Sequence, residues 1–429
     1  MVSANISPSL YRKVTLRLMP ILFISYFVNF LDRVNVGFAN LSMGKSLGMD
    51  QAAFGLGAGM FFVGYFFFEV PSNLALYRFG ARKWIARIVF SWGILTTLTA
   101  FIHTTWQFSV LRFLLGAAEA GFFPGMILYL TWWYPSVLRV RMVAFLLSAV
   151  AIAGLLGGPL SGWIMQYFNG HFGLEDWRWL FLIEGLPCFV LAFWIFFALP
   201  DRPGDARWLN DKEKNAIETA LQVEEVERSH RGAPVHALQS LGSPTVWKLC
   251  LLYFWQAMGL YGVAFWLPSI VKEFGWTGDF KIGLLSAIPW AGAVLMMFIF
   301  GYSSDRMQER KWHAFIAALI GGSGFIFCGV CANVWGDLVG LSFGAGGVMA
   351  LISISWSFPS ALLSGAAAAS GIALINSCGN LAGFVSPTLI GWVADRTKNM
   401  DFGLYLTGSS LFLAAIMLLI FRFTPTERR

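Results

Sequence analysis

Four ionisable residues lie inside stretches of sequence that are otherwise apolar. Asp32 and Arg33 interrupt one such stretch, and Arg112 and Glu119 interrupt another. If both stretches cross a membrane, each charge near the bilayer centre costs about 2.5–3.5 kcal/mol on insertion scales. Residues that carry this cost usually mark the path of an ion, a proton or a substrate, so these four are the first candidates for function.

The chemistry of these residue types indicates anion binding joined to proton transfer. Arginine binds a carboxylate through two parallel hydrogen bonds, which lysine cannot form. A buried acid that shares an arginine with a substrate anion loses its counter-charge when the anion binds, and its affinity for a proton then rises. Anion binding and proton binding therefore favour each other, and this coupling is reciprocal.

Spacing along the chain places several polar residues on common helix faces. Arg112 and Glu119 are seven residues apart, so in a helix they share a face but lie about 10.5 Å apart. Each therefore needs a partner from another helix. Tyr26, Asn29 and Arg33 follow a spacing of three and four and form one polar face, which makes Tyr26 and Asn29 candidate substrate ligands beside Arg33.

The composition indicates a protein that crosses a membrane many times. The chain has 429 residues, of which 57% are hydrophobic and only 12% charged, whereas soluble domains carry about 25% charged residues. The formal net charge of +7 does not indicate nucleic acid here, because membrane topology accounts for it. The lipid bilayer is thus the expected environment.

The elements that position the four residues are membrane-spanning helices. A helix needs about 20 apolar residues to cross a bilayer. Twelve runs meet this length: 18–39, 54–76, 84–104, 108–130, 142–167, 178–199, 246–270, 281–303, 312–334, 337–357, 370–394 and 402–423. A polar linker divides them, so we expect an all-α membrane protein with a six-helix half over 1–200, a cytoplasmic linker over 201–245 and a second six-helix half over 246–429. Within the linker, Asn210 and Glu213 have the spacing of a capping box that opens a short helix.

Basic residues predict the orientation in the membrane. With the N-terminus inside, 22 Lys and Arg residues fall on the cytoplasmic side and 6 on the other side. Cytoplasmic loops carry the excess of Lys and Arg in membrane proteins. We therefore expect both termini in the cytoplasm, in a multi-pass protein of a bacterial inner membrane.

The two halves also resemble each other in sequence. Arg78, Lys83 and Trp84 recur as Arg306, Lys311 and Trp312 at an offset of 228 positions, and Pro159 recurs as Pro387 at the same offset. Two repeats of this kind are typical of transporters that bind their substrate near the membrane midplane, between the repeats.

Several motifs carry a resemblance to a known family. The sequences GYSSDRMQERK at 301–311 and YRFGARK at 77–83 resemble the loop motif of the major facilitator superfamily, with Tyr77 where that motif usually has an acid. Further stretches resemble the anion:cation symporter branch, which includes bacterial permeases for tartrate, hexuronates, galactonate and phthalate. They are FLDRVNVGFA at 30–39, FEVPSNL at 68–74, RFLLGAAEAGFFPG at 112–125 and GIALINSCGNLAGF at 371–384.

The resemblance implies a role for each of the four charged residues. Arg33 matches the arginine that binds the substrate carboxylate. Asp32 and Glu119 match proton-coupling acids, and Arg112 matches an arginine that interacts with the acid of the fourth helix. The fold of the superfamily implies a central cavity lined by helices 1, 4, 7 and 10 and open alternately to each side.

The second half repeats none of these charges. Leu260 and Tyr261 occupy the positions offset from Asp32 and Arg33. We therefore expect uncharged substrate contacts from this half, or alternatively hydrogen bonds that only pack helices together. The candidates are Tyr261, Gln256, Trp356, Asn376 and Asn380.

Other polar residues fit structural roles better. We expect Glu69 and Glu184 to form structural or interfacial pairs, and Arg78, Asp305 and Arg306 to belong to a conformational latch. The five His residues lie at helix ends or in loops without metal spacing, so no metal, no cofactor and no enzymatic activity are expected.

The sequence thus predicts a secondary transporter, monomeric, that imports a small organic anion together with protons. A sugar acid, a tartrate-like dicarboxylate and an aromatic carboxylate remain open as substrates. The stretch 154–162 with Pro159 resembles an antiporter motif, so an anion exchanger or efflux antiporter is the alternative. A membrane sensor fits less well, because the longest polar segment has only about 45 residues.

Overall fold

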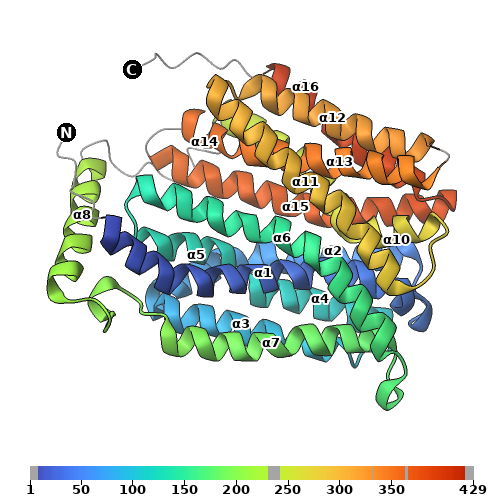
Figure 1. The fold of residues 1–429 in the computed structure, drawn as a ribbon, viewed down its shortest axis with the longest axis horizontal. Coiled ribbons are helices and arrows are strands. Elements are labelled where there is room, and N and C mark those ends of the chain that lie inside the picture. The colour runs from blue at the N-terminus through green and yellow to red at the C-terminus, as the bar shows by residue number, and fades with distance from the viewer. Residues whose placement is uncertain (1–7, 230–241, 332, 363–365, 421–429) are drawn as a thin grey trace.

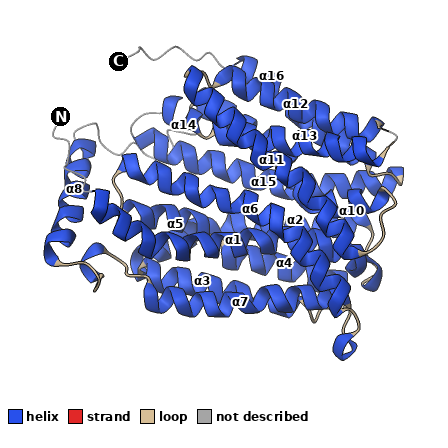
Figure 2. Cartoon of the chain, viewed as in Figure 1, coloured by secondary structure: helices blue, strands red, loops and turns tan. Residues whose placement is uncertain are grey.

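The chain forms a bundle of long helices in a computed structural model that describes residues 8–229, 242–331, 333–362 and 366–420 (Figures 1 and 2). The helices before the linker are α1 (Pro8–Ser46), α2 (Gln51–Phe79), α3 (Ala81–Thr99), α4 (Thr105–Glu119), α5 (Phe122–Thr131), α6 (Ser136–Phe168) and α7 (Asp176–Ala198). The helices after it are α10 (Pro244–Glu273), α11 (Asp279–Met307), α12 (Lys311–Val330), α13 (Val334–Ser355), α14 (Ser357–Leu362), α15 (Ala366–Thr397) and α16 (Asp401–Ile420).

Each of the twelve predicted runs coincides with one helix or with two consecutive helices. The fourth run is divided into α4 and α5, and the tenth into α13 and α14. Ten helices in the described part of the chain are long and apolar enough to cross a membrane. The remaining two predicted spans coincide with α3, which carries three basic residues near its start, and with α15.

The linker helix α8 (Asp211–Ser229) lies across one end of the bundle, the end at which α1 begins (Figure 1). We call this the α8 end. The predicted capping box is confirmed, because Asn210 Oδ1 accepts from the backbone of Glu213 at 2.8 Å and the Glu213 carboxylate accepts from the backbone of Asn210 at 2.9 Å. A hydrogen bond from the Lys13 ammonium also holds the pKa of Glu213 below its usual range. At the other end of α8, Glu224 accepts from the backbone of Ser136 at 2.8 Å, so α8 is attached to the first residues of both α1 and α6.

Two glycines allow α2 and α4 to pack with their backbones in contact. A Cβ atom at Gly116 would overlap the carbonyl oxygen of Phe61, and one at Gly64 would overlap that of Phe113. Small residues permit this close approach, which drives helix association where the surrounding lipid is as apolar as the side chains. The contact holds the helix of Arg112 and Glu119 against α2.

At the end opposite α8, the two halves of the bundle contact each other closely. Asp395 of α15 accepts hydrogen bonds from the first backbone amides of α2, at 3.3 Å from Gln51 and 2.5 Å from Ala52. Gln166 of α6 accepts in the same way from the backbone of Phe280 in α11 at 3.1 Å. Ala52 and Phe280 are 228 positions apart, which is the offset of the sequence repeat. The donors of the two contacts therefore correspond in the repeat, whereas the acceptors Gln166 and Asp395 are 229 positions apart, one of them neutral and the other charged.

Replacing Gly116 with alanine is expected to destabilise the protein by about 1–3 kcal/mol, because overpacking at a backbone contact forces the helices apart. The thermal unfolding midpoint of the purified protein in detergent measures this effect. Gly301→Ala is the matched control, since nothing lies within 4 Å of a Cβ atom at that position. Equal midpoints for the two variants would contradict the packing argument.

Removing the charge of Asp395 is expected to loosen the closure opposite α8. Asp395→Asn weakens a charge-assisted contact between the halves, so the population open at that end should rise. Spin labels at Phe172 and Trp335, both strongly exposed at that end, should then report a larger share of long distances in double electron–electron resonance. Asp50→Asn is the control, because Asp50 caps the same helix at 2.8 Å from the backbone of Ala53 without joining the halves. A similar shift in both variants would refute a specific role for Asp395.

Candidate functional site

A cavity of about 560 Å³ lies in the middle of the bundle and extends to Asp305 and Arg310 at the α8 end. Helices of both halves line it, namely α1, α2, α5, α6, α10, α11, α13 and α15. The expected lining by the first, fourth, seventh and tenth spans is thus present, and four further helices complete the wall. Since the halves are in contact at the opposite end, the cavity opens only toward α8.

Arg33 lies in the cavity wall and forms an ion pair with Glu119. The distance from Arg33 Nη2 to Glu119 Oε2 is 3.2 Å, and Arg33 Nε donates to the same oxygen at 3.3 Å. Asn29 also donates to Oε2, at 2.7 Å. Three donors thus converge on one carboxylate oxygen, and the other oxygen, Oε1, is buried without a hydrogen-bond partner. The partner that Glu119 needed from another helix is therefore Arg33.

The fourth span is broken directly after Glu119. Helix α4 ends at this residue, and Gly121 starts α5 in a left-handed conformation with φ of 82°. Glycine adopts this conformation without steric cost, and a Cβ atom here would lie 2.6 Å from the hydroxyl oxygen of Ser72. The break places the carboxylate of Glu119 at the last turn of α4, facing α1.

Arg112 is fully buried and lies beside an aromatic ring. Its Cζ atom is 4.9 Å from the ring centre of Phe61, and Cζ of Arg33 is 5.1 Å from the same ring. Nε and Nη2 of Arg112 have no hydrogen-bond partner. The Arg112 charge acts on Asp32 and Glu119 through space, so the four charged residues form one electrostatic cluster.

Asp32 points away from the cavity into a buried network. It accepts hydrogen bonds from Thr96 at 2.8 Å and from Asn35 at 3.2 Å. The same amide nitrogen of Asn35 donates to Glu184 at 2.6 Å, and Ser161 donates to Glu184 at 3.0 Å. Two buried carboxyl groups therefore share one amide, and no ion pair joins either of them to a cation among the described residues.

The candidates from the second half divide into two groups. Tyr261, Trp356, Asn376 and Asn380 line the cavity, as does Tyr26 from the first half. Gln256 is fully buried outside the cavity, where its Oε1 accepts from Ser355 at 2.8 Å. The interpretation of Gln256 as a substrate ligand therefore fails for this conformation, and its contact with α13 fits the alternative of helix packing. Asn29 is likewise buried and faces Glu119 instead of the cavity.

Aromatic side chains that the sequence did not single out complete the site. Tyr65 lies in the wall with its ring centre 5.4 Å from Cζ of Arg33, and Tyr253 packs against Trp356 with ring centres 5.0 Å apart. Phe30 also lines the cavity. The sequence of an apolar helix does not distinguish an aromatic residue in a cavity wall from one that faces lipid. The available signal was the position of Tyr65, one turn before the FEVPSNL motif.

Glu69 and Glu184, for which structural or interfacial pairs were expected, are held by neutral hydrogen-bond donors. Glu69 accepts hydrogen bonds from Asn376 at 2.9 Å and from Asn380 at 3.4 Å, and Glu184 accepts from Asn35 and Ser161. All four donors are neutral, and no described cation forms an ion pair with either acid. The expectation of pairing is correct only in the sense that Glu69 joins the two halves.

The predicted latch residues lie exposed at the α8 end and are not joined across the halves. Asp305 pairs with Arg310 of the same half at 2.8 Å. Arg78 lies against the ring of its neighbour Phe79, at 5.6 Å from Cζ to the ring centre. In this conformation the cavity is open at that end, so a latch between the halves has no partners within reach.

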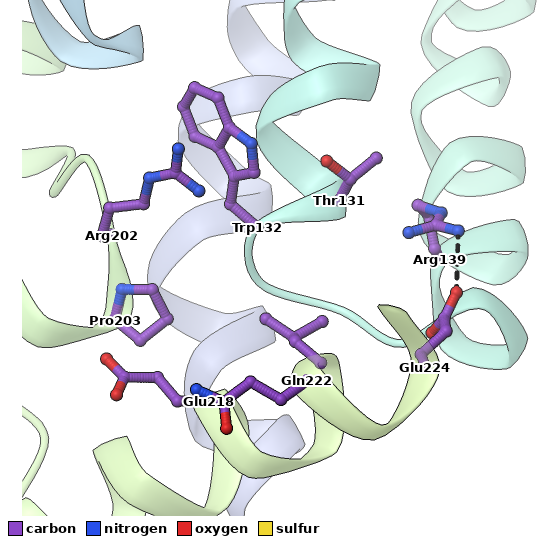
Figure 3. Close-up of a pocket in the computed structure, with 9 residues that line it drawn as sticks. Thr131, Trp132, Arg139, Arg202, Pro203, Glu218, Gln222 and Glu224 are labelled. Carbon is purple, nitrogen blue, oxygen red and sulfur yellow. Dashed lines mark hydrogen bonds and ion pairs between the residues drawn. The ribbon is translucent and has the colours of Figure 1, made fainter. Parts of the chain in front are cut away.

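A second hollow, of about 450 Å³, lies under α8 and is separate from the central cavity (Figure 3). Its basic side chains are already engaged, because Arg139 pairs with Glu224 at 3.3 Å and Arg202 lies 3.8 Å above the ring of Trp132. Among the described residues, no three His, Cys, Asp or Glu side chains are grouped as ligands for a metal ion. The central cavity is therefore the candidate site.

Known proteins of similar sequence and fold agree with this architecture. Residues 22–387 match the sequence profile of the Major Facilitator Superfamily. A protein of Agrobacterium vitis named "Putative tartrate transporter" is 43% identical over 98% of this chain and 92% of its own length. A quinolone resistance transporter of Acinetobacter baumannii is 41% identical over 95% of this chain and 92% of its own length. The partially occluded, inward-open structure of the xylose transporter XylE from Escherichia coli superposes with a TM-score of 0.77 at 16% identity, over 96% of this chain and 99% of XylE.

The family match covers most of the chain, and the relatives match nearly all of it. The helix bundle as a whole has the fold of XylE. The protein is thus a multi-pass membrane transporter and not an enzyme, and it belongs to the major facilitator superfamily.

Proposed function

We propose that this transporter imports a small organic anion together with protons. Arg33 binds the carboxylate of the substrate, and Tyr26, Tyr261, Trp356, Asn376 and Asn380 contact the rest of the molecule. The relative named for tartrate supports an organic acid as the substrate class. Sugar acids, tartrate-like dicarboxylates and aromatic carboxylates all fit a cavity of this size and polarity.

The observation that carries the proposal is the ion pair of Arg33 at the cavity wall. Its side chain is 13% exposed, so a substrate can reach the guanidinium, whereas Glu119 is fully buried behind it. A substrate carboxylate that binds Arg33 competes with Glu119 for the same donors. Glu119 then loses part of its counter-charge in a buried site, which favours uptake of a proton.

Proton coupling also follows from the energetics of anion import. Moving one negative charge against an inside-negative potential costs about 2.3 kcal/mol per 100 mV. One proton cancels the charge of a monoanion, and a second makes uptake favourable. Glu119 and Asp32 are the proposed proton sites, and Arg112 links them electrostatically.

For the orientation, we propose that the α8 end faces the cytoplasm of a bacterial cell and that the protein lies in the inner membrane with both termini inside. The excess of basic residues at that end supports this orientation. Residues 1–200 and 246–429 would then rock as two bodies about the cavity, with 201–245 as their linker and Arg78, Asp305 and Arg306 meeting when the inner side closes. We propose that the protein works as a monomer.

Efflux or anion exchange is the second candidate, and the relative named for quinolone resistance favours it. Uptake and efflux differ in the response to a proton gradient. An acidic outside drives an importer to accumulate the anion inside. The same proton gradient drives a proton-coupled exporter to move its substrate out. The direction of accumulation in vesicles separates the two.

Arg33→Lys is expected to weaken binding at least tenfold, because lysine lacks the paired donors of the guanidinium. Tenfold corresponds to about 1.4 kcal/mol. Uptake of labelled tartrate, galactonate and phthalate by proteoliposomes, with an imposed pH gradient and membrane potential, measures the effect. Arg87→Lys is the control, since Arg87 lies 4.0 Å above the ring of Trp84, outside the cavity.

Unchanged affinity in Arg33→Lys would reject Arg33 as the carboxylate ligand. Uptake by the wild type that ignores both the pH gradient and the membrane potential would reject proton symport itself.

The shared amide of Asn35 generates a separate expectation. When Asp32 and Glu184 are both ionised, two like charges share one hydrogen-bond donor, so the wild type should lose stability as rising pH removes their protons. Glu184→Gln removes one of the charges and should stabilise the protein by about 1 kcal/mol at pH 8 and by less at pH 5. Thermal unfolding across this pH range measures the difference. A constant difference between the variant and the wild type would show that the two acids do not interact.

A further inference from the structure

Glu69 is a buried acid that joins the two halves at the wall of the cavity. It lies in α2 with 9% of its surface exposed, and its two carboxylate oxygens accept from different residues of α15. Asn376 Nδ2 lies 2.9 Å from Oε1, and Asn380 Nδ2 lies 3.4 Å from Oε2. The two asparagines are one helical turn apart, so their amides face the same way, and both line the cavity.

The charge of Glu69 is held mainly by these two neutral donors. Arg33 acts on Glu69 through space but is engaged in the ion pair with Glu119. The other titratable groups that act on Glu69 from the surrounding helices are Tyr65 of α2 and Tyr253 and Tyr261 of α10. A buried carboxylate is tolerated only when hydrogen bonds or counter-charges replace its hydration. The two amides therefore decide whether Glu69 can remain ionised.

Glu69 also lies close to the arginine that is proposed to bind the substrate. The guanidinium of Arg33 contacts the ring of Tyr65 at 5.4 Å, and Glu69 follows Tyr65 by four residues on the same face of α2. Glu69 is thus one turn, about 6 Å along the helix axis, closer to the α8 end. A small organic acid held by Arg33 spans this distance with its remaining oxygen atoms.

Those oxygen atoms compete with Glu69 for the same donors. Hydroxyl and carboxylate oxygens of a substrate accept hydrogen bonds, and the amides of Asn376 and Asn380 are the donors exposed to the cavity on that side. If the substrate takes these donors, Glu69 is left buried without a partner. A negatively charged substrate also adds a like charge nearby. Both changes disfavour the carboxylate form of Glu69.

We propose that Glu69 is a third proton-carrying acid of the transport cycle, which gains a proton when the substrate replaces its carboxylate at Asn376 and Asn380. The inference rests on the proposed function, because it requires an organic anion in this cavity. The O–H bond forms on one carboxylate oxygen of Glu69 while an O–H bond of a hydronium ion in the cavity water breaks, and the buffer outside replaces the proton that is consumed. When the substrate leaves, the amides return to Glu69 and the proton is released toward the α8 end.

Calorimetry counts the protons involved. Binding of tartrate, gluconate and phthalate to the purified wild type at pH 7.5, in two buffers of different ionisation enthalpy, gives the number of protons taken up for each bound molecule. Glu69→Gln keeps an acceptor for the asparagine amides but cannot take up a proton. The variant should bind at least one of these acids with about one proton fewer than the wild type, as linkage requires.

Two variants control this experiment. Asp50→Asn removes the same charge from the same helix outside the cavity, and its proton uptake should equal that of the wild type. Glu69→Asp keeps a titratable acid with a shorter reach. In infrared difference spectra, binding should produce a protonated carboxyl band in the wild type, at a shifted position in Glu69→Asp and absent in Glu69→Gln.

The outcomes separate this inference from the proposed function. If Glu69→Gln binds with the same proton uptake as the wild type, or if the infrared band persists in it, Glu69 is not a proton carrier, while the anion site stands. If Glu69→Gln does not fold, a wild-type band that keeps its position in Glu69→Asp overturns the inference. If the wild type binds none of tartrate, gluconate and phthalate, the proposed organic-anion site is overturned, and the inference about Glu69 falls with it.

Discussion

The ion pair between Arg33 and Glu119 is the interaction on which the rest of the site depends. It joins α1 to the fourth span at the point where that span is broken, and it leaves the guanidinium facing the cavity. A buried pair of this kind is weak support for stability, since the cost of desolvating both charges offsets much of their attraction. Under the proposed function the pair matters for another reason. Arg33 can release the Glu119 carboxylate as it binds the carboxylate of a substrate, so the guanidinium is paired throughout.

The centre of the bundle contains more acids than cations. Arg33 and Arg112 are surrounded by Asp32, Glu119, Glu184 and Glu69, and hydrogen bonds from neutral side chains hold three of these acids. An excess of carboxyl groups in a medium of low polarity favours bound protons. Under the proposed function, these acids are proton sites arranged around a binding site for anions, and some of them face the cavity while others lie behind it.

The sequence was sufficient to predict the helices and the principal charged residues. Long apolar runs fix the spans, and the offset of 228 residues relates the halves, because both signals are local or periodic. The seven residues between Arg112 and Glu119 indicated that Glu119 needs a partner from another helix, but not that this partner is Arg33. The partners of Glu69 could not be predicted in this way, since Asn376 lies more than 300 residues away and only the contact between α2 and α15 brings them together. Gln256 was misassigned because one helix presents different faces to the cavity and to its neighbours.

The closure opposite α8 has a consequence that follows from its unequal acceptors. Asp395 binds the start of α2 with a full charge, whereas Gln166 binds the start of α11 with a neutral amide. Dissolved salt screens a contact between a carboxylate and a helix terminus far more than a contact between an amide and a backbone group. A higher ionic strength on that side therefore weakens the contact of Asp395 with α2 and leaves the contact of Gln166 with α11 nearly unchanged. A higher salt concentration on that side therefore shortens the time that the transporter stays open toward α8.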